Sequence, residues 1–479
     1  MNKYEICKNL NFADCELAIL RQAVDTAEEK KGKTVANSPE VKRIIGIVEN
    51  FIRHNKLICY GGTAINNILP KQDQFYNTDI EIPDYDFFSW NALENAKSLV
   101  DIYIKEGFVE VEAKSGQHHG TYKVYVNFIP VADISYIPKE LFNALKKEAI
   151  RVAGILYAPP NYLRMSMYLE LSRPDGDVSR WEKVLKRLTL LNRNYPLTAH
   201  QCSHIDFQRK LSNINTNTNT EGRGEPNKSE EIYETVKTTL MDQGVVFFGG
   251  YAVSLYSQYM PKHLRKRLEK IPDFDVLSEE PLKTAQIVKE RLLDINIKNV
   301  KILKRPAVGE IIAPHYEIRV GNDVVSFIYE PLACHSYNVL KEKGYEIKVA
   351  TIDTMLSFYL AFLYANRPYY DKDRILCMSK YLFEVQEKNR LQQKGLLKRF
   401  SINCMGHQET VEEMRASKTE KFAELKNKKK DPEYEEWFLR YRPLDAKELN
   451  NDKEKTKSSK KNKSKKSKKT RKKSRGLFF

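Results

Sequence analysis

Apolar positions along the chain follow two different spacings, one typical of helices and one typical of strands. Residues 38–53 repeat apolar side chains at helical spacing behind Ser38, a favoured N-cap, and Pro39, a favoured first helical residue. An apolar strand-like run at 57–60 ends in two glycines, and an apolar-patterned helix follows it. Alternating segments within 118–138 and within 313–331 each predict two adjacent strands. The pattern therefore predicts an α+β fold, with a mixed sheet and flanking helices.

The same order of elements occurs twice along the chain. The string LICYGGTAINNIL, which begins at Leu57, resembles VVFFGGYAVSLY, which begins at Val245. The acidic string IPDYDFFS at 82–89 returns as IPDFDVLS at 271–278. From the second glycine to the first Asp there are 22 residues in the first copy and 23 in the second. A repeat kept in this register predicts two tandem domains of similar fold.

Two polar segments set the limits of these domains. Residues 212–228, SNINTNTNTEGRGEPNK, are low in apolar side chains and rich in Asn and Thr, which is typical of a linker. Residues 453–475 carry 14 Lys or Arg and one Glu, so they supply +13 of the net charge of +17. Such a segment repels itself and is predicted to be disordered. We expect a first domain at 1–211, a linker at 212–228, a second domain at 229–444 and a disordered Lys-rich tail at 445–479.

The composition also indicates the environment of the protein. The most apolar run, residues 355–365, is too short to span a bilayer, and the first 20 residues contain no apolar signal segment. Seven scattered cysteines without a C-x-x-C pair are typical of reduced thiols in an intracellular protein. We therefore expect no membrane association and no disulfides. The basic tail has two interpretations, a solubilising or nuclear-address segment, or a sequence-independent contact with RNA.

Asp84 and Asp86 become informative through their neighbours. By themselves they are compatible with a solvated turn after Pro83. On a strand, however, residues i and i+2 point to the same face, about 7 Å apart. Asp133 can supply a third carboxylate from a neighbouring predicted strand. Three carboxylates directed at one point suit a pair of Mg²⁺ ions, and such a site supports in-line nucleotidyl transfer with release of pyrophosphate.

Gly61 and Gly62 mark the predicted turn from strand to helix. Without side chains, they let backbone N–H groups and the helix N-terminus approach a triphosphate, and Thr63 can add a hydroxyl donor. The alternative is that the glycines only ease the turn. That alternative loses weight because the acid pair and Asp133 follow in order.

In this order the residues resemble the DNA-polymerase-β-like nucleotidyltransferase superfamily, whose pattern is Gly-Gly or Gly-Ser at a helix start, then D-x-D, then a single Asp. The strings YGGTAINNILP, EIPDYDFFS, KSGQHHGTYKVYVNFIPVADISYIP and SRPDGDVSRWEKVLKRL are similar to the poly(A) polymerase catalytic subunit of giant and other large nucleocytoplasmic DNA viruses. The resemblance covers about residues 40–195. It implies that the metal-binding catalytic residues are Asp84, Asp86 and Asp133. It also implies that the residues that hold the ATP phosphates are Gly61, Gly62 and Thr63.

Two further cations are candidates for ATP binding. In SRWEKVLKRL, Arg180 and Lys183 lie with Arg187 at helical spacing, which suits a triphosphate or an RNA backbone. The alternative is a solvated helical face with Trp181 and Leu185 buried. We predict that Arg180 and Lys183 contact ATP.

The second copy keeps both glycines, Gly249 and Gly250, but departs from the pattern at the third carboxylate. An alignment that matches Tyr136 with Tyr329 places Ser326 opposite Asp133. A neutral hydroxyl cannot replace a carboxylate as a ligand for a hard metal ion. We therefore expect a degenerate, catalytically silent copy, although it retains the acid pair of Asp273 and Asp275.

The resemblance implies template-independent polyadenylation of mRNA 3′ ends, in which AMP is transferred from ATP with Mg²⁺ or Mn²⁺ as cofactor. Two alternatives stay open: another nucleotidyltransferase, such as a uridylyl transferase or an oligoadenylate synthase, and a catalytically inactive RNA-binding scaffold. We expect an RNA 3′ end and ATP as partners, a homodimer that closes around RNA, and a location in the virion and the host cytoplasm. The basic tail makes nuclear entry a further alternative.

Overall fold

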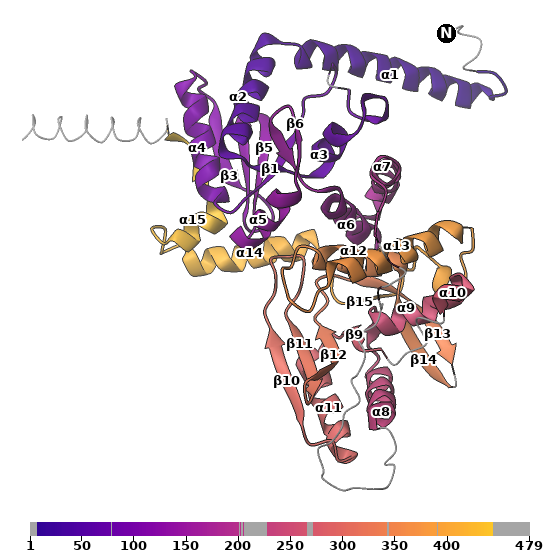
Figure 1. The fold of residues 1–479 in the computed structure, drawn as a ribbon. Helices are drawn as coiled ribbons and strands as arrows, with labels where there is room; N and C mark the ends of the chain where they lie inside the picture. Colours follow the sequence, from indigo (N-terminus) through magenta and orange to yellow (C-terminus); the bar gives the residue numbers. More distant parts are fainter. Residues whose placement is uncertain are drawn as a thin grey trace, which may run out of the picture. The chain divides into compact units, whose positions relative to one another are not determined.

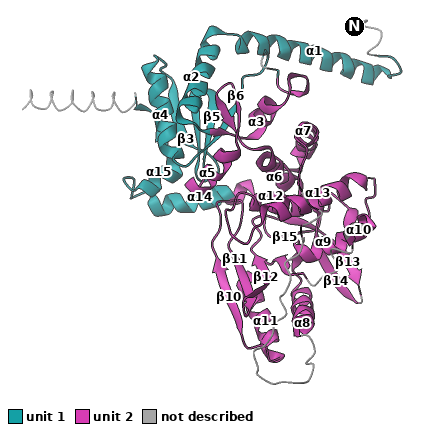
Figure 2. Cartoon of the chain, viewed as in Figure 1, with its two compact units in different colours: residues 1–57, 77–136, 414–479 teal, residues 58–76, 137–413 magenta. Residues whose placement is uncertain are grey.

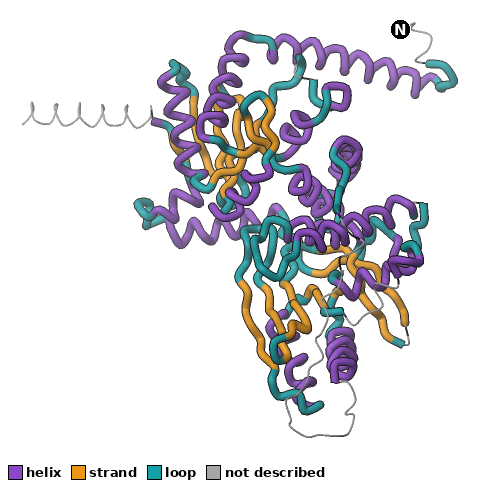
Figure 3. The backbone as a smooth tube through the Cα atoms, viewed as in Figure 1, coloured by secondary structure: helices purple, strands orange, loops and turns teal. Residues whose placement is uncertain are grey.

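The computed structural model describes residues 7–77, 79–200, 202, 205, 228–265, 272–342, 344–389 and 391–443. Helices and strands alternate along the chain, so the predicted α+β class is confirmed (Figure 3). The predicted linker, apart from Lys228, and the predicted tail at 445–479 lie outside the described residues. Within the described residues, no helix has the length and apolar character needed to cross a bilayer.

Spatial contacts divide the chain into two compact units, each built from separate segments (Figure 2). Unit 1 comprises residues 1–57, 77–136 and 414–479, and unit 2 comprises residues 58–76 and 137–413. The domain limits at 211 and 229 derive from the repeat and stay a prediction.

Unit 1 contains a five-stranded part of a sheet with the order β16-β3-β4-β5-β2. Figure 1 labels β3 and β5 of this part. Its strands are β2 (Tyr85–Ser89), β3 (Val111–Ser115), β4 (Thr121–Val126), β5 (Ile129–Tyr136) and β16 (Arg440–Tyr441). Its helices are α1 (Phe12–Ala36), α2 (Pro39–Asn55), α4 (Ala92–Lys105), α15 (Pro432–Phe438) and most of α14 (Val411–Leu425). Because β16 pairs antiparallel with β3, the segment at 414–443 returns to a sheet built from residues 85–136.

The helix predicted at 38–53 is confirmed as α2. The Ser38 hydroxyl accepts a hydrogen bond from the backbone N–H of Val41, and Pro39 is the first helical residue. One face of α2 buries five apolar side chains, and Lys56 ends the helix in the left-handed conformation with φ 52°. Since an isolated helix of this length is marginal in water, burial of this face stabilises α2.

Unit 2 contains the whole second sheet, with the order β10-β11-β12-β9-β8-β14-β13-β15. These strands are β8 (Val246–Phe247), β9 (Phe274–Leu277), β10 (Val300–Arg305), β11 (His315–Val320), β12 (Asp323–Tyr329), β13 (His335–Glu342), β14 (Tyr345–Ala350) and β15 (Cys404–Met405). Three more strands of this unit are β1 (Ile58–Cys59), β6 (Ile150–Val152) and β7 (Ile155–Tyr157). Its helices are α3 (Gly61–Ile68), α5 (Lys139–Glu148), α6 (Pro160–Leu171), α7 (Trp181–Asn194), α8 (Lys228–Asp242), α9 (Gly250–Tyr256), α10 (Lys262–Arg265), α11 (Pro281–Asp294), α12 (Ile352–Phe362) and α13 (Lys372–Lys388).

Strand order confirms the duplication read from the sequence. The order β3-β4-β5-β2 returns as β10-β11-β12-β9, and β1-β7-β6 returns as β8-β14-β13. In both copies the strand with the acid pair runs parallel to the strand that follows the hairpin, β2 with β5 and β9 with β12. Each hairpin also carries a β-bulge at the same place, between Val124 and Tyr125 in the first copy and between Ile318 and Arg319 in the second.

The positions of these bulges show which residue of the second copy is the counterpart of Asp133. Asp133 lies opposite Lys123, one residue before the first bulge, and Phe327 lies opposite Glu317, one residue before the second. The counterpart of Asp133 is therefore Phe327, and the expected match with Ser326 was wrong by one residue. The alignment failed because it was anchored on Tyr136 and Tyr329, whose environments differ: Tyr136 is 54% exposed and Tyr329 is fully buried.

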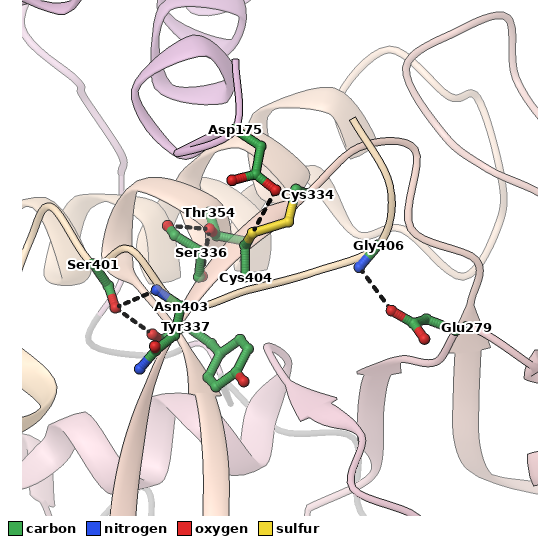
Figure 4. The surroundings of a disulfide bond; sticks show 10 residues. All are labelled: Asp175, Glu279, Cys334, Ser336, Tyr337, Thr354, Ser401, Asn403, Cys404 and Gly406. Carbon is green, nitrogen blue, oxygen red and sulfur yellow. Dashed lines mark hydrogen bonds between the residues drawn. A yellow bond between two sulfur atoms is a disulfide. The ribbon is translucent and has the colours of Figure 1, made fainter. Parts of the chain in front are cut away.

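The expectation of reduced thiols was also wrong. The structure contains three disulfides, Cys7–Cys15, Cys202–Cys377 and Cys334–Cys404. Figure 4 shows the third, which joins the segment before β13 to β15. Two of these bonds connect cysteines 175 and 70 residues apart. Sequence spacing carries no sign of such pairs, because only the fold brings the partners together.

Candidate active site

Two neighbouring strands of unit 1 bring the acid pair and the third carboxylate together. Asp86 on β2 lies directly opposite Asp133 on β5, and Asp84 lies two residues before Asp86. Cross-strand partners share a face of the sheet, so Asp86 and Asp133 point to the same side. Asp84 is exposed, whereas Asp86 and Asp133 are half-buried. The predicted common face for the three carboxylates is consistent with this register.

A lysine that the sequence analysis missed completes this face. Lys123 on β4 lies opposite Asp133, and its ammonium donates a hydrogen bond to Asp133 Oδ2. The second carboxylate oxygen of Asp133, Oδ1, is buried and has no hydrogen-bond partner. An acceptor in this state is rare in folded proteins and is typical of a functional atom.

The carboxylates of Asp84 and Asp133 interact electrostatically. Although the Asp84 residue as a whole is exposed, desolvation of its carboxyl group raises its pKa, the charge of Asp133 raises this pKa further, and Lys123 lowers it. Burial is the largest single effect on Lys123 and lowers its pKa, but the hydrogen bond to Asp133 and the charges of Asp133, Tyr125 and Asp84 together outweigh it, so the net pKa is raised. Asp84, Asp86 and Asp133 do not bring one carboxylate oxygen each within 4.8 Å of one another. Among the described residues, only Asp175, Cys334 and Cys404 bring three potential ligand atoms this close together.

The predicted phosphate-binding glycines begin helix α3 in unit 2. Gly61 has φ 71°, a left-handed conformation that favours glycine, and Tyr60 before it is extended. Thr63 is buried in the first turn. The structure thus confirms the predicted strand-to-helix turn. That these glycines and the carboxylates of unit 1 form a single site stays a prediction.

The backbone of Gly62 is covered by two side chains. A Cβ atom at Gly62 would lie 2.5 Å from the Tyr76 hydroxyl and 2.9 Å from Arg187 Nη1. Arg187 Nη2 donates a hydrogen bond of 2.6 Å to that hydroxyl, and its guanidinium lies 4.8 Å from the ring centre of Phe75. A side chain at position 62 would displace the ends of the Tyr76 and Arg187 side chains, so the glycine leaves room for them. A cation therefore lies beside the N-terminal end of α3, where an anion would be stabilised.

Asn66 holds the segment that carries Tyr76. Its side-chain oxygen accepts hydrogen bonds from the backbone N–H groups of Phe75, at 2.8 Å, and Tyr76, at 2.9 Å. Asn66 is only 2% exposed. Asn66 is the sixth residue of α3. The sequence gives no signal of its role, because its two partners, Phe75 and Tyr76, lie in the loop that follows the helix.

Among Arg180, Lys183 and Arg187, the cations singled out from the sequence, Arg187 is the one beside the glycines. Arg180 pairs with Glu170 at 3.1 Å, and Lys183 is exposed. Their predicted contact with ATP stays a prediction. A cavity of about 750 Å³ in unit 2, lined by residues of α7 and α13, contains none of the predicted site residues.

In the second copy both residues of the acid pair are buried, whereas in the first copy Asp84 is exposed and Asp86 is half-buried. Asp273 is 3% exposed and Asp275 is 8% exposed. A Cβ atom at Gly249 would lie 2.1 Å from Asp275 Oδ2, so this carboxylate occupies the space above the glycine. The Asp275 carbonyl accepts hydrogen bonds from the N–H groups of Phe248 and Gly249. The second acid pair therefore serves as a packed part of the turn.

Aromatic side chains fill the rest of the corresponding face. Phe327, the counterpart of Asp133, is fully buried and stacks on Tyr369, with ring centres 5.1 Å apart. Glu317, the counterpart of Lys123, is buried and pairs with Arg305 and Arg319. Phe327 removes the third carboxylate of the pattern, and two arginines bind Glu317, so the second copy is degenerate as a metal site.

Comparison with known proteins shows which family the first copy resembles. Residues 46–177 match the family model of the poly(A) polymerase catalytic subunit. The resemblance expected from the sequence is confirmed. The matched segment contains the glycines and the three carboxylates, and it ends before Arg180.

Relatives with this family name occur in two large DNA viruses. A protein of African swine fever virus, provisionally named a poly(A) polymerase catalytic subunit, is 34% identical over 171 residues, which are 34% of this chain and 36% of that protein. A mimivirus protein with the same provisional name, from Acanthamoeba polyphaga mimivirus, is 29% identical over 214 residues, 44% of this chain and 34% of that protein. The chain thus spans about a third of the length of the curated relatives it matches.

A solved structure extends the similarity to the fold of both copies. The crystal structure of the Megavirus polyadenylate synthase matches with a TM-score of 0.71, over 87% of this chain and 84% of that chain. The sequence identity is 18%, so this match shows a shared fold.

Proposed function

We propose that this chain is a template-independent poly(A) polymerase, which transfers AMP from ATP to the 3′ end of mRNA and releases pyrophosphate. The observation that carries the proposal is the pairing of Asp86 with Asp133 across β2 and β5, inside the segment that matches the poly(A) polymerase catalytic subunit family. A structural role alone does not explain half-buried carboxylates on adjacent parallel strands, because their charges repel.

The carboxylates fit Mg²⁺ or Mn²⁺. Both ions prefer hard oxygen ligands, and Asp133 Oδ1 is a buried acceptor that a cation would satisfy. Asp84, Asp86 and Asp133 would hold the ions. When bound, the ions activate the attacking 3′ hydroxyl and neutralise the leaving pyrophosphate.

The start of α3 fits the triphosphate of ATP. Backbone N–H groups at Gly61, Gly62 and Thr63 would donate to phosphate oxygens, and Arg187 supplies a guanidinium beside them. We propose Arg180 and Lys183 as outer contacts of the same nucleotide. Arg187 is the cation whose position best supports phosphate binding, because it is fixed by Tyr76 and Phe75.

We also propose that the protein works as a homodimer. Helix α1 leaves apolar side chains exposed along most of its length, including Leu17 at 49%, Leu20 at 58% and Val24 at 45%. The spacing of these three residues places them along one side of the helix, as in helices that pair with a second helix. Light scattering after size-exclusion chromatography should give twice the chain mass for the wild type and a lower mass for Leu20→Glu. A wild-type monomer at micromolar concentration would contradict the dimer.

The activity is tested by extension of a short RNA primer with each nucleoside triphosphate separately. We expect long products with ATP alone, and no products after Asp133→Asn, which keeps the side-chain shape and removes the charge. Asp275→Asn is the matched control and should retain activity, because Asp275 is packed against Gly249. Extension with UTP instead would favour a uridylyl transferase. RNA binding without extension by any nucleotide would favour the scaffold.

A further inference from the structure

Lys123 occupies the place on Asp133 where a cation is needed. Its ammonium binds Asp133 Oδ2, whereas Oδ1 is buried without a partner. Lys123 and Asp133 are direct cross-strand partners on β4 and β5, so the backbone fixes the proximity of the two side chains. The lysine therefore supplies the positive charge that the carboxylate lacks in the absence of metal.

The contact has a cost for metal binding. A carboxylate oxygen that accepts a strong hydrogen bond from an ammonium is less available as a ligand, and a fixed positive charge repels a divalent cation nearby. The carboxylates of Asp84, Asp86 and Asp133 are also not within 4.8 Å of one another in this arrangement. A metal ion must therefore draw Asp133 away from Lys123 to gather its ligands.

The second copy supports a link between the lysine and the metal site. There, the counterparts of Lys123 and Asp133 are Glu317 and Phe327. Glu317 pairs with two arginines and has no carboxylate opposite it. A cation at the position of Lys123 is thus present in the copy that presents the third carboxylate and is absent from the copy in which an aromatic ring replaces that carboxylate.

We propose that Lys123 is a positioning residue that holds the place of the catalytic metal on Asp133, and that a divalent cation displaces it. The inference rests on the proposed function insofar as that function assigns a metal to Asp133. It adds that the Lys123 ammonium reduces the repulsion between the half-buried carboxylates until a metal ion binds. Loading the metal then exchanges one cation for another at Asp133.

The first test measures the exposure of the ammonium in the full-length protein. Lysine acylation by a small N-hydroxysuccinimide ester, read by mass spectrometry, should label Lys123 several-fold faster with saturating Mn²⁺ than without it. Lys114 is the matched control, because it lies opposite Lys123 on β3, contacts Glu112 at 3.6 Å and has no bond to Asp133. Its labelling should change little. Equal labelling of Lys123 with and without bound Mn²⁺ would overturn the proposal.

The second test measures metal affinity directly. Titration of free Mn²⁺ by electron paramagnetic resonance, without nucleotide, should show binding to Lys123→Met that is about tenfold tighter or more, since the metal no longer competes with a charge-assisted hydrogen bond. Lys123→Arg should bind like the wild type. Weaker or unchanged binding by Lys123→Met, with an unchanged circular dichroism spectrum, would show that the lysine only supports Asp133. If Mn²⁺ does not bind the wild type at all, or binds Asp133→Asn equally well, the metal site of the proposed function fails too.

Discussion

Asn66 offers a sharp test of how the glycine end of α3 is built. Its side-chain oxygen receives two backbone hydrogen bonds, from Phe75 and Tyr76, and these bonds hold Tyr76 against Gly62 and Arg187. Asn66→Ala removes the acceptor and leaves both N–H groups without it. We expect the segment at 70–77 to open locally while the rest of α3 keeps its structure.

The magnitude follows from the two bonds. Each is of normal length, 2.8 and 2.9 Å, and the acceptor belongs to a side chain that is 2% exposed. A hydrogen bond of this kind contributes about 1 kcal/mol net, and unsatisfied groups raise the cost, so Asn66→Ala should destabilise the segment by about 2–3 kcal/mol. Gln74→Ala is the matched control. Gln74 holds the same segment through one hydrogen bond to the Leu69 carbonyl at 3.1 Å, but it is exposed, so its loss should cost less than about 1 kcal/mol.

Hydrogen exchange is the suitable assay, because a chain with two compact units need not unfold in one step. Amides in peptides that cover residues 70–77 should exchange roughly 30-fold faster in Asn66→Ala than in the wild type, which corresponds to about 2 kcal/mol of local stability. The same peptides in Gln74→Ala should change by less than about fivefold. Equal exchange in the two variants would refute the assignment of Asn66 as the anchor of Tyr76.

Three further predictions test other parts of the molecule. Arg187→Ala should raise the KM for ATP in primer extension by about tenfold or more. The control is Lys186→Ala on the exposed side of α7, which should leave this KM unchanged. Equal KM values for the two variants would contradict a role of Arg187 in phosphate binding. Cys202→Ser should lower the stability of the oxidised protein by up to about 5 kcal/mol in chemical denaturation, because its disulfide closes a loop of 175 residues, and a reductant should abolish the difference. Acid should destabilise the protein. Burial lowers the pKa of His315 to about 4, and burial together with the charge of Arg173 lowers the pKa of His335 to about 3. Each neutral imidazole therefore contributes stability that is complete above pH 6.5 and is lost at about 1.4 kcal/mol per pH unit as the pH falls toward the folded-state pKa. A denaturation midpoint that does not change between pH 7 and pH 5 would contradict that account.

Local patterns were sufficient to predict several elements. The N-cap and proline at 38–39 predicted α2, and the alternation at 118–138 and 313–331 predicted the two hairpins, because capping and alternation depend on neighbouring residues. The repeated strings predicted two sheets of one design, and strand order confirms this. The D-x-D pair and Asp133 were predicted on adjacent strands. The structure confirms this for Asp86 and Asp133, whereas Asp84 lies one residue before β2.

Other features depended on contacts that no local pattern encodes. The role of Asn66 depends on a loop that folds back to it, and the disulfides join cysteines that are far apart in the sequence. The return of residues 440–441 to the edge of β3 likewise joins segments more than 300 residues apart, and no composition signal marks it. Such contacts are decided by the sum of many packing terms over the whole fold.

The sequence by itself determined which residues are predicted to carry the chemistry: the glycine pair, the acid pair and the single Asp133, in an order that only one copy completes. The tertiary structure decided which residues face them. A single β-bulge between Val124 and Tyr125 shifts the pairing of β4 by one residue, so Lys123 lies opposite Asp133 instead of Ala132. The bulge lies at the same place in the second copy, and the pairing around it identifies Phe327, and not Ser326, as the counterpart of Asp133. The physical reason is that side chains in a strand alternate between the two faces of the sheet. A register shift of one residue therefore exchanges the side chains on the face of the carboxylates with those on the opposite face.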